Sequence, residues 1–542
     1  MKHLFKPFLG IALIAFISLS FMLAGGKKPK QIWSKEFKGE RGMQLSEIVS
    51  KDKNGFYTLH KTLAAFKKYK LTLKRFSYNL DEKASEEFDL DYGGKERIFE
   101  NMIDFGGELR CFTSFLNKKD KKYYLFVETV NRATLKSKRD IQKVAEVTYA
   151  GRGKRKSDID YTTYQFIPSR DSSNLLIFSN LPNRANNNER FACNVLNDDL
   201  KVLWYNEIEI PYEDELFSIK QTSVSSSGDV YVLGKLYKDK VKNVRRNKVN
   251  FKYQIVGYKK FGKEKVIYDI NLPEKFITDM NIAVDDNNDI ICTGFYGNES
   301  MYTVNGTYFM KIDGKTKKVL TANSKEFETD FLLQNLSEKG EKKAKKKIAK
   351  GKEDKLSVRE YDIDELIINK DGSVNMIGEQ FRVYTTVVTT TNSNGQTTTR
   401  TVTHYIFNEI IVVNFSSSGN INWYKRIPKY QHTTDDRGRY SSYALMKQED
   451  KLHFFYNDHV ENINIDDDKG KKYSWTKRKK KTVVMMTTID ANGNMSRTPI
   501  TNVKEADMLL RPIVCEQISN DQFVFYGEKG AKKYKFAMIT PR

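Results

Sequence analysis

Short apolar stretches alternate with polar residues along almost the whole chain, and tight polar turns join many of them. The segment 369–381, NKDGSVNMIGEQF, is typical, because a turn rich in Asn, Asp and Gly precedes alternating apolar residues. Such alternation after a turn predicts a β-hairpin. Similar phrases occur eight times, for example SEIVSKDKNGFYTL, DMNIAVDDNNDIICTGF and PIVCEQISNDQFVFYGE. The pattern therefore predicts a repeat protein built from strands.

Two further strand-like segments follow most of these hairpins. A third strand such as TYFMKI or NEIIVVNF leads into a turn, and a fourth strand with a central aromatic or apolar residue follows, as in SGNINWYKRIPKY. Four-stranded antiparallel sheets repeated around an axis form a β-propeller. We therefore predict an all-β fold, a β-propeller of four-stranded antiparallel blades, with eight blades and seven as the alternative. Two stacked β-sandwiches are the rival fold, but they would not repeat one four-strand phrase.

The two ends of the chain predict how the ring closes. The last repeat, PIVCEQISNDQFVFYGEKGAKKYKFAMITPR, stops after three strands, whereas KQIWSKEFKG near the N-terminus has the pattern of a lone fourth strand. Its Trp33 corresponds to Trp204 and Trp423 of other fourth strands. Residues 31–37 are therefore predicted to complete the last blade, which leaves no open sheet edge at either end.

Two of the repeats carry a resemblance to a known class of proteins. GTYFMKIDGKTKKVL and SSSGNINWYKRI resemble the repeats of secreted bacterial β-propellers, in which a strand ending in Lys, an apolar residue and Asp precedes a Gly turn and a Trp strand. The resemblance extends over nearly all of the chain after its first 26 residues. It implies the fold and an exported bacterial setting, and it carries no active site with it.

The first 26 residues predict export. Lys2 and Lys6 precede an apolar run at positions 8–23, and the small residues AGG follow it at 24–26. This is the layout of a cleavable signal peptide, residues 1–26. The apolar run is shorter than the roughly 20 residues that cross a bilayer, although an uncleaved anchor is the alternative. We expect a periplasmic or extracellular protein without a later membrane span, and the sequence leaves outer-membrane association open.

The net positive charge of the chain bears most directly on where a binding site lies. The chain has 92 Lys and Arg against 69 Asp and Glu, a formal charge of +23, of which +21 belongs to residues 27–542, the predicted single propeller domain. Most of the surplus lies in three basic inserts, residues 238–250, 333–358 and 461–481. In a four-stranded blade, connections from strand two to strand three and from one blade to the next leave the same face. The inserts are therefore predicted to share one face of the propeller.

This basic face is the predicted binding site. The candidate ligand-binding residues are Arg152, Lys154, Arg155, Lys242, Arg245, Arg246, Lys248, Lys471, Lys472, Tyr473, Trp475, Lys477 and Arg478. Clustered positive charge attracts anionic partners, and salt screens that attraction. The two aromatic residues could stack on sugar rings or pack against a protein. The alternative is that the basic runs are solvated loops that keep a large protein soluble.

Catalytic and metal-binding motifs are missing from the sequence. The six His residues are scattered without an HExxH or a Cys and His cluster, and the acidic run at 466–468 lacks the spacing of a calcium loop. We therefore predict no catalytic residue, no metal and no cofactor.

The function predicted from these features is that of an exported, non-catalytic binding or scaffold propeller of the bacterial cell envelope. Its expected partner is anionic: a polysaccharide, a lipid headgroup or an acidic protein. Nucleic acid is the least favoured partner, because export removes the chain from most of it. The alternative is a propeller enzyme that acts on polysaccharide through carboxylates in the central channel. The sequence leaves the oligomeric state undetermined.

The cysteines are predicted to be free thiols. Cys111, Cys193, Cys292 and Cys515 each lie in an apolar, strand-like run, and they fall in predicted blades two, three, five and eight. A protein of this size does not need disulfides to hold its core. Blades that are apart in the ring also hold their cysteines too far apart to bridge.

One hairpin is predicted to be much longer than the others. Residues 381–407 contain two runs rich in Thr and Val around NSNGQ, with Gly395 in the turn. This pattern predicts a two-stranded arm that extends from blade six. Because an isolated hairpin is marginal in water, the arm is expected either to lie across a neighbouring blade or to pair with a partner.

Overall fold

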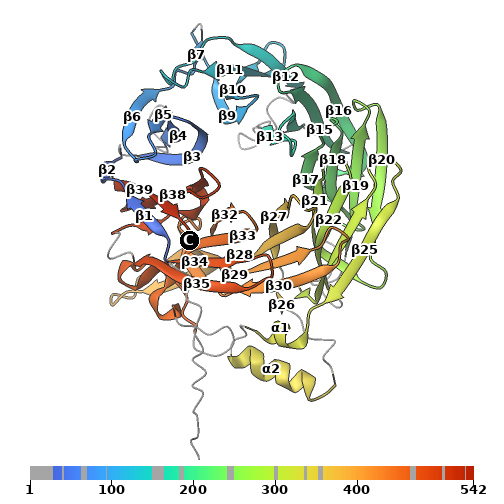
Figure 1. The fold of residues 1–542 in the computed structure, drawn as a ribbon, viewed down its shortest axis with the longest axis vertical. Coiled ribbons are helices and arrows are strands. Elements are labelled where there is room, and N and C mark those ends of the chain that lie inside the picture. Colours follow the sequence, from blue (N-terminus) through green and yellow to red (C-terminus); the bar gives the residue numbers. More distant parts are fainter. Residues whose placement is uncertain are drawn as a thin grey trace, which may run out of the picture.

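Eight four-stranded sheets surround a central channel in the computed structural model (Figure 1). The structure describes residues 28–39, 42–62, 70–92, 94–148, 164–181, 188–240, 250–297, 303–334, 338–351, 358–359, 361–463, 472–502, 507–530 and 533–542. Across these residues the sheets are antiparallel and follow one another around the ring in sequence order. The predicted eight-bladed β-propeller is confirmed, and the seven-bladed alternative is wrong.

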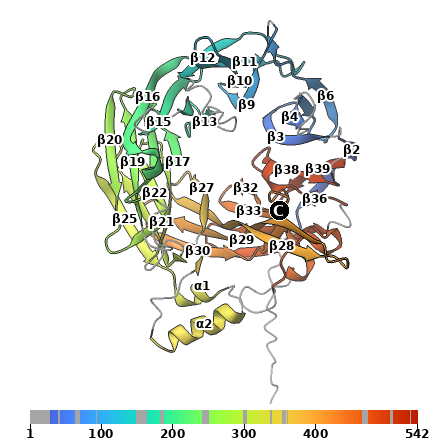
Figure 2. The same cartoon turned by 180° about the vertical axis from the view of Figure 1, so that it is seen from behind.

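Blades one to four each begin with the strand next to the channel and end at the outer rim (Figures 1 and 2). Blade one contains β3 (Met43–Asp52), β4 (Gly55–Thr62), β5 (Leu71–Phe76) and β6 (Glu82–Glu87), and blade two contains β9 (Ile98–Phe105), β10 (Glu108–Asn117), β11 (Lys122–Val130) and β12 (Gln142–Thr148). Blade three contains β13 (Tyr164–Pro168), β14 (Asn174–Asn180), β15 (Asn188–Asn197) and β16 (Val202–Glu213). Blade four contains β17 (Phe217–Val224), β18 (Val230–Tyr237), β19 (Phe251–Lys259) and β20 (Glu264–Ile270).

Blades five to seven follow the same order. Blade five contains β21 (Phe276–Val284), β22 (Ile290–Gly297), β24 (Gly306–Ile312) and β25 (Val319–Glu326). Blade six contains β27 (Asp362–Ile368), β28 (Val374–Thr391), β29 (Thr397–Phe415) and β30 (Ile421–Ile427). Blade seven contains β32 (Ala444–Gln448), β33 (Lys451–His459), β34 (Thr482–Ile489) and β35 (Met495–Asn502). Short pairs lie between blades, namely β7 (Asp91–Tyr92) with β8 (Lys95–Glu96) and β23 (Thr303–Val304) with β26 (Val358–Arg359).

Blade eight joins the two ends of the described chain. Its strands are β36 (Leu509–Leu510), β37 (Glu516–Gln517), β38 (Phe523–Glu528), β39 (Lys533–Thr540), β1 (Lys30–Trp33) and β2 (Phe37–Lys38). The N-terminal strands pair antiparallel with β39, with Trp33 opposite Ala537 and Phe37 opposite Tyr534. The predicted closure is confirmed. Phe37 is buried, whereas Ile32 is 47% exposed.

The hydrophobic core is a series of interfaces between neighbouring blades. Along β18, Val230 and Val232 pack against blade three, while Tyr231 and Leu233 pack against blade five. Successive side chains of a strand point to opposite faces of its sheet, so a strand between two blades must be apolar on both faces. This geometry explains the continuous apolar runs that the sequence shows in the second and third strands.

The four cysteines lie in the predicted blades. Cys111, Cys193 and Cys292 are buried on β10, β15 and β22, and Cys515 lies beside β37 in blade eight. All four are thiols in the structure. Burial raises the pKa of Cys292 to about 12, and that of Cys515 to about 12, so both thiols are poorly reactive at neutral pH.

The long hairpin is confirmed as the outer halves of β28 and β29, with Gly395 in the turn at φ +76°. A short strand, β31 (Gln431–Thr434), pairs antiparallel with residues 404–407 of β29. The side chain of Gln431 also donates to the carbonyl of Asn457 in blade seven at 2.8 Å. The base of the arm is therefore held against blade seven by its own chain, while Val387 near the tip is 68% exposed.

Helices are few in the part of the chain that the structure describes. They are α1 (Thr329–Leu333), α2 (Glu338–Ile348) and the 3₁₀ turns η1 (Asp214–Leu216), η4 (Val460–Asn462), η5 (Lys479–Lys481) and η6 (Pro512–Val514). Both α-helices lie between blades five and six, outside the ring (Figure 1). Among the described helices, none has the length and apolar character needed to cross a bilayer.

Candidate functional site

The connectivity of the blades defines two faces of the propeller. Antiparallel order places the connections from strand two to strand three, and from blade to blade, at one face, which we call the insert face. The turns from strand one to strand two and from strand three to strand four define the opposite turn face. The ends of β18 and β33, where two of the basic inserts begin, belong to the insert face, and so does the connection from blade five to blade six.

The predicted ligand-binding residues divide into two sets. Those outside the described residues are Arg152, Lys154, Arg155, Lys242, Arg245, Arg246, Lys248 and Lys471. Those that the structure places are Lys472, Tyr473, Trp475, Lys477 and Arg478, all in the connection from β33 to β34 at the insert face. Lys477 and Arg478 are exposed, and Lys477 forms an ion pair with Asp436 at 3.2 Å.

Trp475 is not on the surface. Its side chain is 0% exposed, and its Nε1 donates to Thr482 Oγ1 at 3.0 Å. Its backbone N–H donates to the carbonyl of Tyr430 at 2.7 Å, and its ring packs with Leu509. The indole therefore fills the junction between the arm and blades seven and eight, and the expected stacking of Trp475 on a ligand is corrected.

Tyr473 and Lys472 also make contacts within the chain. The ring of Tyr473 stacks on His459 with a centroid distance of 5.2 Å and an interplanar angle of 12°. Its backbone N–H donates to Asn462 Oδ1 at 3.0 Å, which fixes the connection on η4. Lys472 Nζ lies 5.6 Å from the centroid of the Tyr430 ring. Both residues are half-buried, so the exposed positive charge among the described residues here comes from positions 477, 478, 480 and 481.

Helix α2 is the best-defined basic element, although no residue of it was among the predicted ligands. Ala344 is buried in an apolar cluster with Phe331, and Ile348 packs against the same cluster. The spacing of these two residues places both on one face of the helix. The other sides carry exposed lysines at 342, 343, 345, 346 and 347. The single apolar pair within a lysine-rich run was the sequence signal for a docked helix.

Carboxylates line the central channel in blade six. Asp362, Asp364 and Glu365 lie on β27, the strand next to the channel, where a bulge follows Ile363. Burial within the channel wall raises the pKa of Asp364 to about 7, and the nearby charge of Glu379 adds to the effect. Tyr443 donates a hydrogen bond to Asp364 Oδ2 at 2.8 Å.

Glu379 itself belongs to a buried ion pair. Its Oε1 lies 2.6 Å from Lys429 Nζ, and Ser442 Oγ donates to its Oε2 at 2.8 Å. The side chain of Lys429 is 0% exposed. Because the carboxylate is held by a lysine and a hydroxyl, it has the surroundings of a structural pair. It does not provide the second free carboxyl that glycoside hydrolysis would require beside Asp364.

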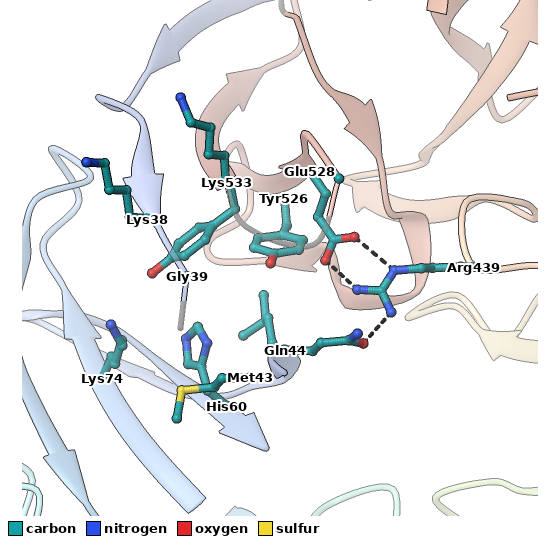
Figure 3. Close-up of a pocket in the computed structure, with 13 residues that line it drawn as sticks. Lys38, Gly39, Met43, Gln44, His60, Lys74, Arg439, Tyr526, Glu528 and Lys533 are labelled. Carbon is teal, nitrogen blue, oxygen red and sulfur yellow. Dashed lines mark hydrogen bonds and ion pairs between the residues drawn. The ribbon is translucent and has the colours of Figure 1, made fainter. Parts of the chain in front are cut away.

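A small cavity of about 90 Å³ lies where blade eight meets blade one (Figure 3). Arg439 reaches into its wall and donates to both carboxylate oxygens of Glu528, at 2.9 and 2.7 Å. The same guanidinium also donates to Gln44 of blade one. His60, buried beside this cavity, forms a hydrogen bond with Thr58 Oγ1 through its Nε2 at 3.0 Å. The bonds of Arg439 connect the first and last blades at the insert face.

Protonation of His60 is expected to destabilise the protein in acid. Burial, together with the nearby charge of Lys74, lowers the pKa of His60 from 6.5 to about 3. The unfolded chain therefore binds this proton at a higher pH than the folded chain, and stability is lost as the pH falls below 6.5. At pH 5 the loss is about 2 kcal/mol. Urea unfolding should show that the free energy of unfolding falls less between pH 7.5 and pH 5.0 for His60→Gln than for the unaltered protein. An equal fall in both proteins would contradict the role assigned to His60.

Comparison with known proteins identifies no family for this chain. No protein-family model matches the chain, and no curated protein matches it. The solved Dos1 propeller is 8% identical, with 94% of this chain and 95% of that chain covered and a TM-score of 0.42. The β-propeller domain of the Trilobed protease from Pyrococcus furiosus is 12% identical, with 72% of this chain and 99% of that chain covered and a TM-score of 0.32.

A third solved structure is much longer than the part that matches. Prolyl oligopeptidase B from Galerina marginata, bound to a 35mer hydrolysis and macrocyclization substrate, is 12% identical with a TM-score of 0.31. The match covers 67% of this chain and 38% of that chain. All three TM-scores are below 0.5, so the functional argument rests on the site residues of this chain.

Proposed function

We propose that the protein is an exported, non-catalytic binding or scaffold propeller of the bacterial cell envelope, which holds an anionic partner through its insert face. The observation that carries this proposal is helix α2. Ala344 and Ile348 anchor the helix on the propeller, and lysines occupy its other sides. A helix that is already docked presents its charge without the entropic cost of ordering a loop on binding. The partner class is a polysaccharide, a lipid headgroup or an acidic protein.

Export is proposed from the N-terminal sequence. Residues 1–26, which lie outside the described residues, have the charged start, apolar run and small residues of a signal peptide. The formal charge of +21 on residues 27–542 suits a partner of opposite sign. Four exposed basic positions among the described residues of the connection from β33 to β34, namely 477, 478, 480 and 481, add to the charge of this face.

A polysaccharide-cleaving enzyme is the second candidate, and Asp364 is the observation in its favour. A carboxyl group with a pKa of about 7 is suited to act as a general acid at neutral pH. Glu379, which is close enough to raise that pKa, is occupied by Lys429 and Ser442. We therefore rank binding above catalysis.

Neutralising α2 is expected to weaken binding to polyanions. The test variant is Lys342→Gln/Lys343→Gln/Lys346→Gln, which leaves the buried side of the helix intact. Because each basic residue near an anionic surface contributes roughly 1 kcal/mol, loss of three should lower the affinity about a hundredfold in 0.1 M salt. Cosedimentation with phosphatidylglycerol vesicles and titration with polygalacturonate would measure the change, and the affinity of the unaltered protein should fall steeply with added salt.

The matched control removes the same charge from the turn face. Lys53, Lys263 and Lys451 are exposed there, in the turns of blades one, four and seven. Their triple change to Gln should leave most of the binding in place. Equal losses in the two triple variants, or binding that is indifferent to salt, would refute the insert-face proposal and favour the solvated-loop interpretation.

A further inference from the structure

The turn face contains a cavity of about 700 Å³, which is separate from the basic helix and from the channel carboxylates. Its walls come from the turns of blades six and seven and from the first turn of blade eight. Nine of its lining residues provide amide, indole or ammonium groups: Asn369, Lys370, Asn375, Asn414, Asn422, Trp423, Lys447, Gln517 and Asn520. The volume lies within the roughly 300–1,000 Å³ of small-molecule sites.

Three asparagines form a row across blade six at this cavity. Asn422 on β30 donates through Nδ2 to Asn414 Oδ1 at 2.7 Å, and Asn414 on β29 donates to Asn375 Oδ1 on β28 at 2.8 Å. An amide has two N–H donors and an oxygen with two lone pairs. These two bonds use only part of that capacity. The row therefore offers both donors and acceptors to a ligand, at positions fixed by the sheet.

The opposite wall is also rigid. Gln517 of blade eight accepts from the backbone N–H of Lys447 in blade seven at 3.0 Å and donates to its carbonyl at 2.7 Å. Trp423 donates through Nε1 to the carbonyl of Ala491 at 2.8 Å, which fixes its indole between blades six and seven. A Cβ at Gly493 would lie 2.8 Å from this ring, so the turn packs directly on the indole. Preformed walls reduce the entropic cost of binding.

The charge of the lining excludes a polyanion as the ligand. Two lysines, Lys370 and Lys447, line the cavity together with four carboxylates: Asp371, Glu449, Asp450 and Asp490. The excess of carboxylates repels anions, in contrast to the lysines of α2. A neutral molecule with many hydroxyl groups is the ligand class that suits this lining. Amides, carboxylates and lysine can pair with adjacent hydroxyls, and an indole can pack against the apolar face of a sugar ring.

We propose that this cavity binds a neutral oligosaccharide. The site is independent of the proposed anionic partner, because it lies on the other face and carries the opposite charge. The propeller thus has two binding surfaces, one for a polyanion and one for an uncharged glycan. Asn422 is exposed and lies at the open end of the asparagine row, where it can contact a hydroxyl without any rearrangement of the blade.

The test is calorimetric titration with four linear hexasaccharides. Three are neutral, built of glucose, mannose or N-acetylglucosamine, and the fourth is the anionic hexagalacturonate. We expect at least one neutral glycan to bind, with an affinity that hardly changes between 0.05 and 0.5 M salt, and hexagalacturonate not to compete for its site. Asn422→Ala should weaken that binding about tenfold, as for the loss of one good hydrogen bond.

The control variant is Asn54→Ala, an exposed asparagine in the first turn of blade one on the same face. It should bind the glycan as the unaltered protein does. Both variants change an exposed side chain, so circular dichroism should show that each is folded, with a slightly lower melting temperature for Asn422→Ala because it loses the hydrogen bond to Asn414. Absence of binding by all three neutral glycans, or equal binding by the Asn422 and Asn54 variants, would overturn the proposal. Competition by hexagalacturonate would do so as well, because it would place the glycan at a polyanion site.

Discussion

A protein that lacks residues 28–38 should have an open ring and a much lower melting temperature. This deletion removes β1 and β2, exposes the edge of β39 and takes away Phe37. The Phe37 ring stacks on Tyr534 with centroids 5.3 Å apart and meets Phe76 of blade one edge-on at 5.4 Å. Burial of one such side chain contributes about 1.5–3 kcal/mol, before the lost ladder bonds are counted. Thermal unfolding and light scattering would measure the loss and the aggregation of the open edge.

The control for this deletion is the protein that lacks only residues 1–27. It keeps the N-terminal strands and should melt like the full chain. Phe37→Ala separates packing from pairing, because it retains the backbone of β2; we expect about 3–5 kcal/mol of destabilisation from the cavity it leaves. If the deletion of residues 28–38 left the melting temperature unchanged, the ring would not be held by the N-terminal strands.

Removal of Lys429 should lower the free energy of unfolding more than removal of any other single charged side chain. Lys429→Met leaves the carboxylate of Glu379 buried without its cation, and breaking such a pair costs about 3–5 kcal/mol. Burial already raises the pKa of Glu379 above 4.5, and loss of Lys429 raises it further. The folded variant then binds a proton more readily than the unfolded chain, so its deficit should shrink as the pH falls toward 4.5. Urea unfolding at pH 7.5 and 5.0 would measure both effects.

A double variant provides the comparison. Lys429→Met/Glu379→Gln removes both charges, and we expect it to be more stable than Lys429→Met alone. Recovery should be incomplete, because Lys429 Nζ also donates to the carbonyl of Phe407 at 2.9 Å and to Gln431 Oε1 at 3.2 Å. If the free energy of unfolding of Lys429→Met lay within about 1 kcal/mol of that of the unaltered protein, the ion pair would contribute no more to stability than an exposed pair does.

The repeated blades were predictable because they depend on local sequence. A tight turn and a two-residue alternation describe a hairpin whatever surrounds it, as Gly395 and the Thr-rich runs of the arm illustrate. Closure was predictable for a related reason. A missing fourth strand at one end and a lone strand around Trp33 at the other end have one simple pairing, and the structure contains it.

The role of Trp475 was not predictable, because its neighbours in the sequence are not its neighbours in space. Lysines flank it on both sides, which is typical of an exposed loop. Its burial depends on Tyr430 and Leu509, residues that lie 45 positions before it and 34 positions after it. The same holds for the buried pair of Glu379 and Lys429, which are 50 positions apart.

Alternation and turn residues were therefore sufficient to determine the all-β repeat, the eight blades, the closing strand and the long hairpin. Each of these depends on strand periodicity or on the pairing of one strand with the next. Only the tertiary structure decided which polar residues meet. Asn375 and Asn414 pair in register between β28 and β29, and a bulge between β29 and β30 brings Asn422 to Asn414, so the three form one row. Helix α2 is held on the propeller because Ala344 reaches a core made by blades five and six. Side-chain position across blades depends on long-range packing, which no local pattern records.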